Sequence, residues 1–254
     1  MQKYIFFIDV DGTLIKPKSN NMPQAIVDEF NKVKKAGHII VIVTGRGFIE
    51  TSAIDGIKSA SFLAPIMGNI IIDCETGKKI KEPETLPSAA VKRFVVEVEK
   101  LGRPWSYKTD LEGKTYCDEE FISRHACRKV KKTEYLADLK AGSICQLLVE
   151  GKVSQEIIDE FKMFDFFYMP GDYCDVTRKG FNKAAIVKYF AQQYPKYQTV
   201  AIGDSNNDKA MLMEADISIA MENAKEELKQ MCDYVTQDYQ NLGVLHAMEN
   251  ILKQ

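Results

Sequence analysis

Two carboxylates stand close together just after an apolar run near the start of the chain. The run Tyr4 to Ile8 reads YIFFI and leads directly into Asp9-Val10-Asp11-Gly12-Thr13. At the extended end of a strand, side chains two residues apart point to the same side, so Asp9 and Asp11 can face one site. These carboxylates repel each other unless a cation lies between them, and a hard divalent ion with oxygen ligands fits that place. Taken alone, the pattern is equally compatible with an acidic turn after a strand.

A second acidic segment, Gly203-Asp204-Ser205-Asn206-Asn207-Asp208, also follows an apolar run and is expected to open a helix. Asp204 and Asp208 are four residues apart, so they can share one face of that helix. A helix cap followed by a polar first turn would explain this segment alone. It would not explain why polar, mostly acidic segments recur at the ends of several strands of one sheet.

Two further positions could bind a phosphoryl group. Thr44, in Thr44-Gly45-Arg46, offers a hydroxyl and a backbone N–H at the end of an apolar run. Lys183, in KGFNKAA, stands near the expected start of a helix and could pair with the carboxylates and with phosphate. For each position in isolation, an ordinary turn or a solvated lysine is the more frequent explanation.

The elements that must position these residues alternate between strand and helix patterns. Continuous apolar runs without alternation occur at 4–8, 39–43, 199–202 and 217–220, which is typical of strands buried on both faces of a parallel sheet. Helical spacing of apolar residues separates them, for example at 22–36 and 182–193. We therefore predict an α/β fold with a Rossmann-like parallel-sheet core, in which ligands bind outside the carboxyl ends of the strands.

The middle of the chain has a different pattern. Residues 82–177 contain a long amphipathic helix near 91–101 and short strands near 144–149 and 173–177, without a carboxylate-rich strand end. We expect an inserted α+β domain here, with the core formed by 1–81 and 178–254. Substrate contacts from this domain could come from four residues, although a packing or surface role is favoured for each: Arg103, Trp105, Arg124 and His125.

Together, the polar residues of the core meet the needs of phosphoryl transfer. That reaction requires an in-line nucleophile, groups that neutralise the phosphoryl oxygens and a proton for the leaving group. Asp9 is the expected nucleophile, and Asp11 can move the proton. Thr44 and Lys183 can hold phosphoryl oxygens, and Asp204 can help to hold a metal ion.

The sequence resembles the haloacid dehalogenase superfamily of phosphohydrolases, and specifically its Cof-type sugar phosphatase-like branch with a class IIB cap. The segments that carry the resemblance occur in the family's order, and a tail at 220–244 also looks like this branch. They are IDVDGTL at 8–14, TGR at 44–46, KGFNKAA at 179–185 and GDSNND at 203–208. The resemblance covers 1–80 and 178–254, and it implies that 82–177 is a cap that governs substrate specificity.

The resemblance also implies a role for each matched residue. It implies Mg²⁺ as the cofactor, a metal site formed by Asp9, Asp11 through its backbone carbonyl, Asp204 and Asp208, and phosphate contacts from Thr44, Lys183 and Asn207. Asp9 matches the nucleophile and Asp11 the general acid/base, while Asp208 matches either a direct metal ligand or a support for one. One departure is Gly68-Asn69, which reverses the Asn-Gly order usual in this branch. We therefore assign no catalytic role to Asn69.

Composition limits the remaining classes of function. The chain has 254 residues, a net charge of −2 and a pI near 6.0, whereas a nucleic-acid-binding surface is normally strongly basic. No apolar run approaches the roughly 20 residues that span a bilayer. The six cysteines contain no CxxC pair, which favours reduced, packed thiols. We expect a cytoplasmic protein that acts on a small phosphorylated metabolite, as a monomer or a homodimer.

The expected activity is a Mg²⁺-dependent phosphatase, a phosphoric monoester hydrolase that uses an aspartyl-phosphate on Asp9. One alternative is a phosphomutase of the same architecture, which would return the phosphoryl group to a sugar. Others are a receiver-like signalling domain and a phosphate-binding protein without catalysis. A receiver needs neither Asp11, nor the GDSNND segment, nor an insertion of this size.

Overall fold

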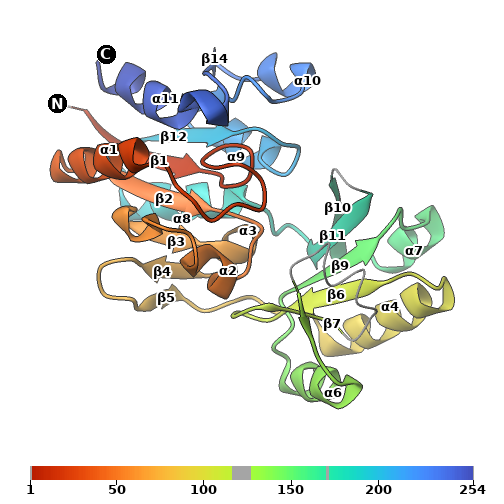
Figure 1. Cartoon of the computed structure of the whole chain (residues 1–254). Helices are drawn as coiled ribbons and strands as arrows, with labels where there is room; N and C mark the ends of the chain where they lie inside the picture. Colours follow the sequence, from red (N-terminus) through yellow and green to blue (C-terminus); the bar gives the residue numbers. More distant parts are fainter. Residues whose placement is uncertain (1, 116–126, 170–171, 254) are drawn as a thin grey trace. The chain divides into compact units, whose positions relative to one another are not determined.

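The computed structural model of this chain describes residues 2–115, 127–169 and 172–253. The chain divides into two compact units. Unit 1 comprises Met1–Arg46, Glu50–Lys81 and Asn182–Gln254, and unit 2 comprises Gly47–Ile49 and Glu82–Phe181. Figure 1 follows the chain through both units.

Unit 1 is built on a sheet that, within the described residues, has eight strands in the order β14-β13-β12-β1-β2-β3-β4-β5. The central strand β1 (Lys3–Ile8) lies between β12 (Tyr197–Gly203) and β2 (Ile39–Val43) and runs parallel to both. The parallel part also includes β3 (Phe62–Ala64), β13 (Ile217–Ala220) and β14 (Tyr234–Val235), and the antiparallel edge consists of β4 (Ile71–Asp73) and β5 (Lys79–Lys81). The predicted α/β class with a parallel-sheet core is confirmed.

The register of this sheet brings three strand ends to the same level. Ile8 pairs with Ile202 on one side and with Ile42 on the other. The residues that follow these strands therefore leave the sheet together at its carboxyl edge, which is where a parallel α/β sheet places its ligands.

Helices cover both faces of this sheet, and Figure 1 shows α1 in front of it and α8 behind it. The expected helix at 22–36 is α1 (Gln24–Lys35), which Pro23 precedes and Gly37, with a φ of 84°, follows. Apolar side chains of α8 (Ala184–Gln193) pack against the inner strands in one buried cluster that contains Ile5, Phe7, Ile186 and Phe190. The other helical segments are α2 (Phe48–Ser52), η1 (Ile57–Ser59), α3 (Pro65–Gly68), α9 (Lys209–Glu214), α10 (Glu226–Lys229), η2 (Tyr239–Asn241) and α11 (Gly243–Leu252).

Unit 2 has its own sheet and its own apolar core. Its described strands run in the order β10-β11-β9-β6-β7-β8, antiparallel except for the pair of β7 with β8. A single cluster of buried residues joins α4 to one face of the sheet and includes Phe94, Trp105 and Leu147. The elements are α4 (Ser88–Lys100), β6 (Trp105–Lys108), β7 (Gly113–Thr115), β8 (Arg128–Lys129), α6 (Lys132–Ala141), β9 (Gln146–Glu150), α7 (Gln155–Glu160), β10 (Phe164–Met169) and β11 (Tyr173–Arg178).

The residues of this unit that were considered for substrate contact have packing partners where they are described. Trp105 is 2% exposed and meets the ring of Tyr135 edge to face. The Arg103 side chain donates a hydrogen bond to the carbonyl of Lys152. Arg124 and His125 lie outside the described residues.

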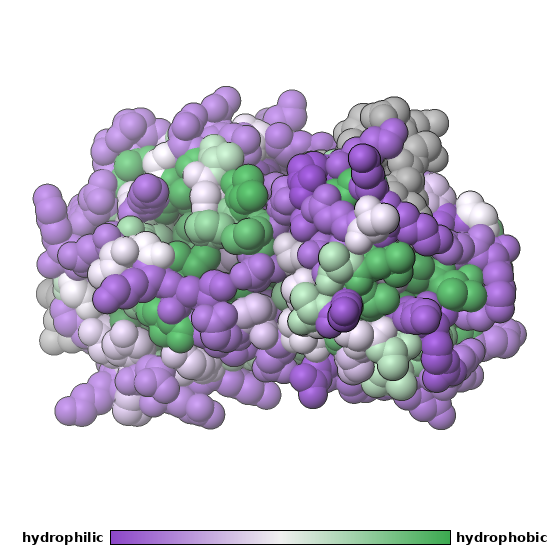
Figure 2. Space-filling model, turned by 90° about the horizontal axis from the view of Figure 1, so that it is seen from below, coloured by the Kyte–Doolittle hydropathy of each residue, from purple (hydrophilic) through white to green (hydrophobic). Residues whose placement is uncertain are grey.

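The surface combines polar and apolar side chains. On the face shown in Figure 2, hydrophilic residues form much of the outer surface, and apolar residues show between them in patches. Within the described residues, no helix combines the length and the apolar character needed to cross a bilayer.

One buried side chain of unit 2 has no hydrogen-bond partner among the described residues. Gln146 at the start of β9 is fully buried, and neither atom of its side-chain amide has a partner within the part of the chain that the structure describes. Its neighbours Leu147 and Val149 face the apolar core, while Gln146 points to the opposite face of the sheet. A buried polar group without a partner costs roughly 1–3 kcal/mol of stability.

We therefore expect Gln146→Leu to raise the free energy of unfolding by about 1–2 kcal/mol, because leucine has a similar volume and no polar atoms. Urea unfolding followed by circular dichroism would measure this change. Gln146→Ala is the matched control, since it removes the same amide but leaves a cavity, and it should destabilise the protein. A less stable Gln146→Leu protein would contradict this explanation.

Candidate functional site

The ends of three neighbouring strands place the polar residues that the sequence singled out. Asp9 follows β1, Thr44 follows β2, and Asp204 follows β12. Two glycines leave room for close contacts at these strand ends, Gly12 between two loops and Gly203 within its own loop. A Cβ on Gly12, whose φ is +86°, would lie 2.5 Å from Asp204 Oδ2, and a Cβ on Gly203 would lie 2.6 Å from the Cβ of Asp208. Only glycine fits at both positions without a shift of the carboxylates.

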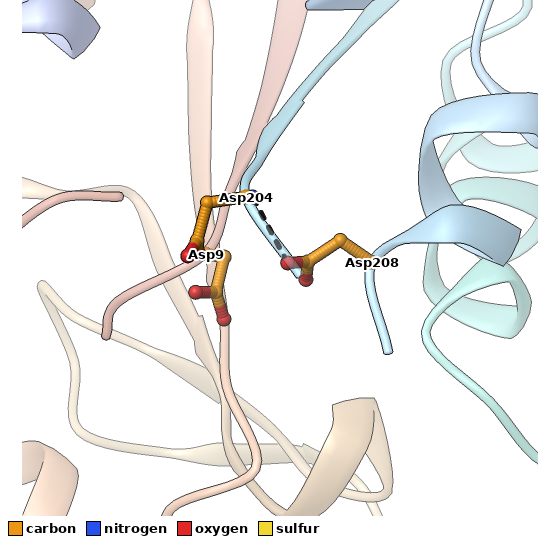
Figure 3. Close-up of side chains that lie close together, drawn as sticks. All are labelled: Asp9, Asp204 and Asp208. Atoms are coloured by element: carbon orange, nitrogen blue, oxygen red, sulfur yellow. Dashed lines mark hydrogen bonds between the residues drawn. The ribbon is translucent and has the colours of Figure 1, made fainter. Parts of the chain in front are cut away.

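Three of the predicted acidic residues form one cluster. Each of Asp9, Asp204 and Asp208 offers a carboxylate oxygen, and these atoms lie within 4.8 Å of one another. Figure 3 shows the three side chains converging from the β1 end, from the β12 end and from the start of α9. Asp9 and Asp208 are buried, and Asp204 is partly exposed. Oxygen ligands in this arrangement suit a hard divalent cation.

Lys183 supplies the positive charge inside this cluster. It lies directly before α8, and its side chain is fully buried. Its ammonium group donates hydrogen bonds to Asp9 Oδ1 and, at 2.6 Å, to Asp208 Oδ1. One lysine balances only one of the three carboxylate charges, so a deficit of positive charge remains.

Asp208 also holds the loop that precedes α9. Its Oδ2 accepts hydrogen bonds from the backbone N–H of Asp204 at 3.2 Å, from the N–H of Ser205 at 3.0 Å and from the Ser205 hydroxyl at 3.1 Å. The same hydroxyl lies 2.6 Å from Asn207 Oδ1 and, having one proton, donates to only one of these two oxygens at a time. The side-chain NH₂ of Asn207 is therefore the part of this residue that could donate to an anion.

Two residues without a role in the sequence analysis contact Asp204. Thr13 Oγ1 donates to Asp204 Oδ1 at 3.0 Å. Asn223 Nδ2 donates to the carbonyl of Gly12 at 2.8 Å and lies 3.3 Å from Asp204 Oδ2. Both lie in segments that carry the family resemblance, IDVDGTL and the tail that begins at 220. That resemblance is the one sequence signal that could have pointed to them.

Thr44 is buried, and one of its two expected phosphate-binding groups is already engaged. Its backbone N–H donates to the carbonyl of Ala64 at 3.2 Å, because β2 and β3 continue their pairing to this point. The expectation that this N–H is free for a phosphoryl oxygen is therefore wrong. The hydroxyl remains, and its oxygen accepts a hydrogen bond from the N–H of Arg46 at 3.1 Å.

Asp11 lies outside the cluster of three carboxylates. Its side chain pairs with Arg46, whose Nε lies 2.8 Å from Asp11 Oδ2 and whose Nη2 lies 2.6 Å from Oδ1. The expectation that Asp9 and Asp11 both direct their carboxylates to one cation is therefore not met by the arrangement of these side chains. A contact through the Asp11 backbone carbonyl stays a prediction.

The electrostatics of the cluster reflect burial and crowding of like charges. Burial, together with the negative charge of Asp208, raises the pKa of Asp9 well above its ordinary value, although Lys183 opposes this shift. Burial and the charge of Asp208 also raise the pKa of Asp204 to about 7. Burial lowers the pKa of Lys183, but the charges of Asp208 and Asp9 outweigh it and the net shift is upward. Without a cation, the folded protein therefore favours protonated carboxyls at this site.

Comparison with known proteins agrees with this geometry. Residues 6–248 match the haloacid dehalogenase-like hydrolase family, and the chain belongs to this family. A phosphoglycolate phosphatase of Methanobrevibacter smithii is 26% identical over 253 residues, which cover 96% of this chain and 97% of that protein. The 5-amino-6-(5-phospho-D-ribitylamino)uracil phosphatase YcsE of Bacillus subtilis is 26% identical over 256 residues, which cover 96% of this chain and 93% of that protein.

A solved structure supports the same fold. The HAD subclass IIB sugar phosphatase BT4131 superimposes with a TM-score of 0.82 at 22% identity, covering 98% of this chain and 99% of that chain. The expected family, the haloacid dehalogenase-like hydrolases, is confirmed by the family match, and the solved structure agrees in fold; the Cof-type branch stays a prediction. The expected enzyme class, a phosphoric monoester hydrolase, is confirmed as well.

The raised pKa values predict how stability changes with pH when no cation is bound. A free aspartate has a pKa of 3.8, whereas Asp204 in the folded protein has one of about 7. Between these values the folded state binds more protons than the unfolded state, so the free energy of unfolding falls as pH rises. Urea unfolding in excess chelator at pH 5 and at pH 7.5 would measure this difference.

Asp204→Asn is the matched control, because it removes one of the crowded charges and should reduce the dependence on pH. The unfolding midpoint of the parent protein should decrease between the two pH values, and that of Asp204→Asn should decrease less. A midpoint that rises equally in both proteins would contradict the electrostatic account.

Proposed function

We propose that this chain is a Mg²⁺-dependent phosphatase that hydrolyses small phosphomonoesters through an aspartyl-phosphate on Asp9. The observation that carries the proposal is the cluster of Asp9, Asp204 and Asp208 at the carboxyl edge of a parallel sheet, with the buried Lys183 paired to Asp9 and Asp208. This arrangement combines a nucleophile, a site for a hard cation and a fixed positive charge.

The donor set fits a divalent metal ion. Three carboxylates and one ammonium leave an excess of negative charge, and oxygen ligands are those that Mg²⁺ prefers. Asp9 and Asp204 would hold the ion directly, together with the backbone carbonyl of Asp11. Asp208 would act mainly as a support, because Lys183 and the loop before α9 already engage both of its oxygens. The bound ion would neutralise charge on the phosphoryl group.

In the proposed first step, a carboxylate oxygen of Asp9 attacks phosphorus. The bond between phosphorus and the leaving oxygen breaks, and Asp11 gives its proton to that oxygen. Lys183, the Thr44 hydroxyl and the NH₂ group of Asn207 would bind the phosphoryl oxygens, since each can donate a hydrogen bond to an anion. Lys183 already donates to Asp9 Oδ1, which leaves Oδ2 as the oxygen better placed to attack.

In the proposed second step, water attacks the phosphorus of the aspartyl-phosphate. Asp11 takes a proton from this water, the bond between phosphorus and Asp9 breaks, and inorganic phosphate is released. The same carboxyl group thus gives a proton in one half of the reaction and receives one in the other.

The substrate is expected to be a small phosphorylated metabolite, and unit 2 is expected to select it. The described part of unit 2 contains none of the catalytic candidates, which suits a role in specificity rather than in chemistry. The relatives differ widely in substrate, from phosphoglycolate to a ribitylaminouracil phosphate. The residue types of the site support a phosphomonoester as the group that these substrates share. We expect neither nucleic acid nor a membrane as a partner.

The proposal predicts that phosphate release requires both Asp9 and a divalent cation. Asp9→Asn has no anionic oxygen for the attack, so turnover of 4-nitrophenyl phosphate should fall by about a thousandfold or more. Chelation should abolish activity, and Mg²⁺ should restore it. Asp28→Asn, an exposed position on α1, is the control and should keep full activity.

Activity that persists in excess chelator, or an active Asp9→Asn protein, would refute the proposal. Detection of free phosphate also separates a phosphatase from a phosphomutase, which would convert sugar phosphates without releasing phosphate.

Asp11 should matter most when the leaving group is poor. A sugar alkoxide leaves badly without a proton, whereas nitrophenolate leaves readily. Asp11→Asn should therefore slow the first step strongly with a sugar phosphate and mildly with 4-nitrophenyl phosphate. The second step should then limit turnover of the artificial ester, so a burst of nitrophenol should precede slow turnover. Equal slowing of the first step for both esters, with an unchanged Mg²⁺ requirement, would argue against this role.

A further inference from the structure

The arginine of the TGR segment holds the carboxylate of Asp11 by both oxygens. Arg46 Nε donates to Asp11 Oδ2 at 2.8 Å, and Nη2 donates to Oδ1 at 2.6 Å. The Arg46 side chain is 13% exposed, whereas that of Asp11 is 36% exposed. A guanidinium that binds a carboxylate through two parallel hydrogen bonds fixes the plane of that carboxylate as well as its position.

Arg46 is itself fixed by other parts of unit 1. Its Nη1 donates to Asn20 Oδ1 at 2.9 Å, and its Nη2 donates to the carbonyl of Ser19 at 2.9 Å. Its own carbonyl accepts a hydrogen bond from the N–H of Ile66 at 2.8 Å. Ile66 has a φ of 52°, a left-handed conformation that is unfavourable for a β-branched residue, so the packing around it must hold this turn firmly.

The hydrogen bonds leave the two oxygens of Asp11 unequal. Oδ1 accepts from Arg46 Nη2 and also from the backbone N–H of Lys18 at 2.9 Å, which uses both of its lone pairs. Oδ2 accepts only from Arg46 Nε among the described residues, so one of its lone pairs is still available. A carboxyl group that exchanges a proton at one defined position does so best when one of its oxygens has an available lone pair and the other has none.

We propose that Arg46 is the positioning residue of Asp11, and that it directs Oδ2 of this carboxylate to exchange the proton. This inference rests on the proposed function. Arg46 acts through Asp11 and keeps its own protons; the proton passes from Asp11 Oδ2 to the leaving oxygen, and later from water to the same atom. Without Arg46, only the N–H of Lys18 would hold the carboxylate of Asp11, and this single hydrogen bond would not fix the orientation of Oδ2.

The test compares phenyl phosphate with 4-nitrophenyl phosphate, two aryl esters that differ by one nitro group and therefore in the basicity of the leaving group. Arg46→Ala should lower kcat for phenyl phosphate by about 10-fold or more, because it removes part of a general-acid contribution of about 10²–10⁴. With 4-nitrophenyl phosphate, kcat should fall by about threefold or less. KM for both esters and the Mg²⁺ concentration for half-maximal activity should stay near the parent values.

A double-mutant cycle with Asp11→Asn shows whether Arg46 acts through Asp11. Once Asp11 can no longer exchange a proton, adding Arg46→Ala should change kcat for phenyl phosphate by less than about threefold. Arg46→Lys is the second variant, in case Arg46→Ala does not fold, since lysine keeps the charge but cannot form two parallel hydrogen bonds. It should show the same preference for the better leaving group. Arg93→Ala, which removes an exposed arginine of unit 2, should change neither ester.

The outcomes separate this inference from the proposed function. Equal loss for both esters would overturn the positioning role and would assign Arg46 a general structural part. A full further loss on the Asp11→Asn background would also overturn it, and so would faster turnover of phenyl phosphate by Arg46→Ala. A parent protein that releases phosphate from neither ester in the presence of Mg²⁺ would instead refute the proposed function, and the inference with it.

Discussion

The buried ammonium of Lys183 is the interaction on which the rest of the site depends. It donates to Asp9 and Asp208, which come from segments at opposite ends of the chain's sequence. Burying a charge without a partner costs several kcal/mol, and so does placing two buried carboxylates side by side. Lys183 therefore allows both carboxylates to be buried, but it leaves an excess of negative charge. Burial, together with the charge of Asp208, keeps the pKa of Asp9 well above its ordinary value, although Lys183 opposes this shift. The excess of negative charge suits the cluster to a divalent cation, as we propose.

The parallel sheet provides the geometry that makes such a cluster possible. Because β1 pairs with β12 and β2 in register, the residues after all three strands emerge at one edge. Glycine at position 12 then lets the two acidic loops approach more closely than a side chain would permit, and glycine at position 203 leaves room for Asp208 of its own loop. Rigid strands that end in short, hydrogen-bonded loops can hold reacting groups to within about 0.5 Å of the geometry that the reaction needs.

Two kinds of carboxylate environment occur at this edge of the sheet. Asp9 and Asp208 are buried with Lys183, whereas Asp11 is more exposed and bound by a guanidinium. Different surroundings are how one site gives chemically similar groups different tasks. A nucleophile must stay near the phosphoryl group, while a group that gives and takes a proton must reach toward the leaving group and the water. The separation of Asp11 from the other carboxylates is consistent with that division of tasks.

The sequence by itself determined the alternation of strands and helices, the apolar strands around Asp9, Thr44 and Asp204, and the family. These features are local, because propensity, periodicity and motif order are carried by neighbouring residues. It did not determine that the Thr44 N–H is used by Ala64, that Thr13 supports Asp204 from 191 positions away, or that Asp11 pairs with Arg46 instead of joining the cluster. Those contacts depend on strand register and loop conformation, which arise only when distant segments pack. Tertiary structure therefore decided which of the predicted groups remain available for chemistry.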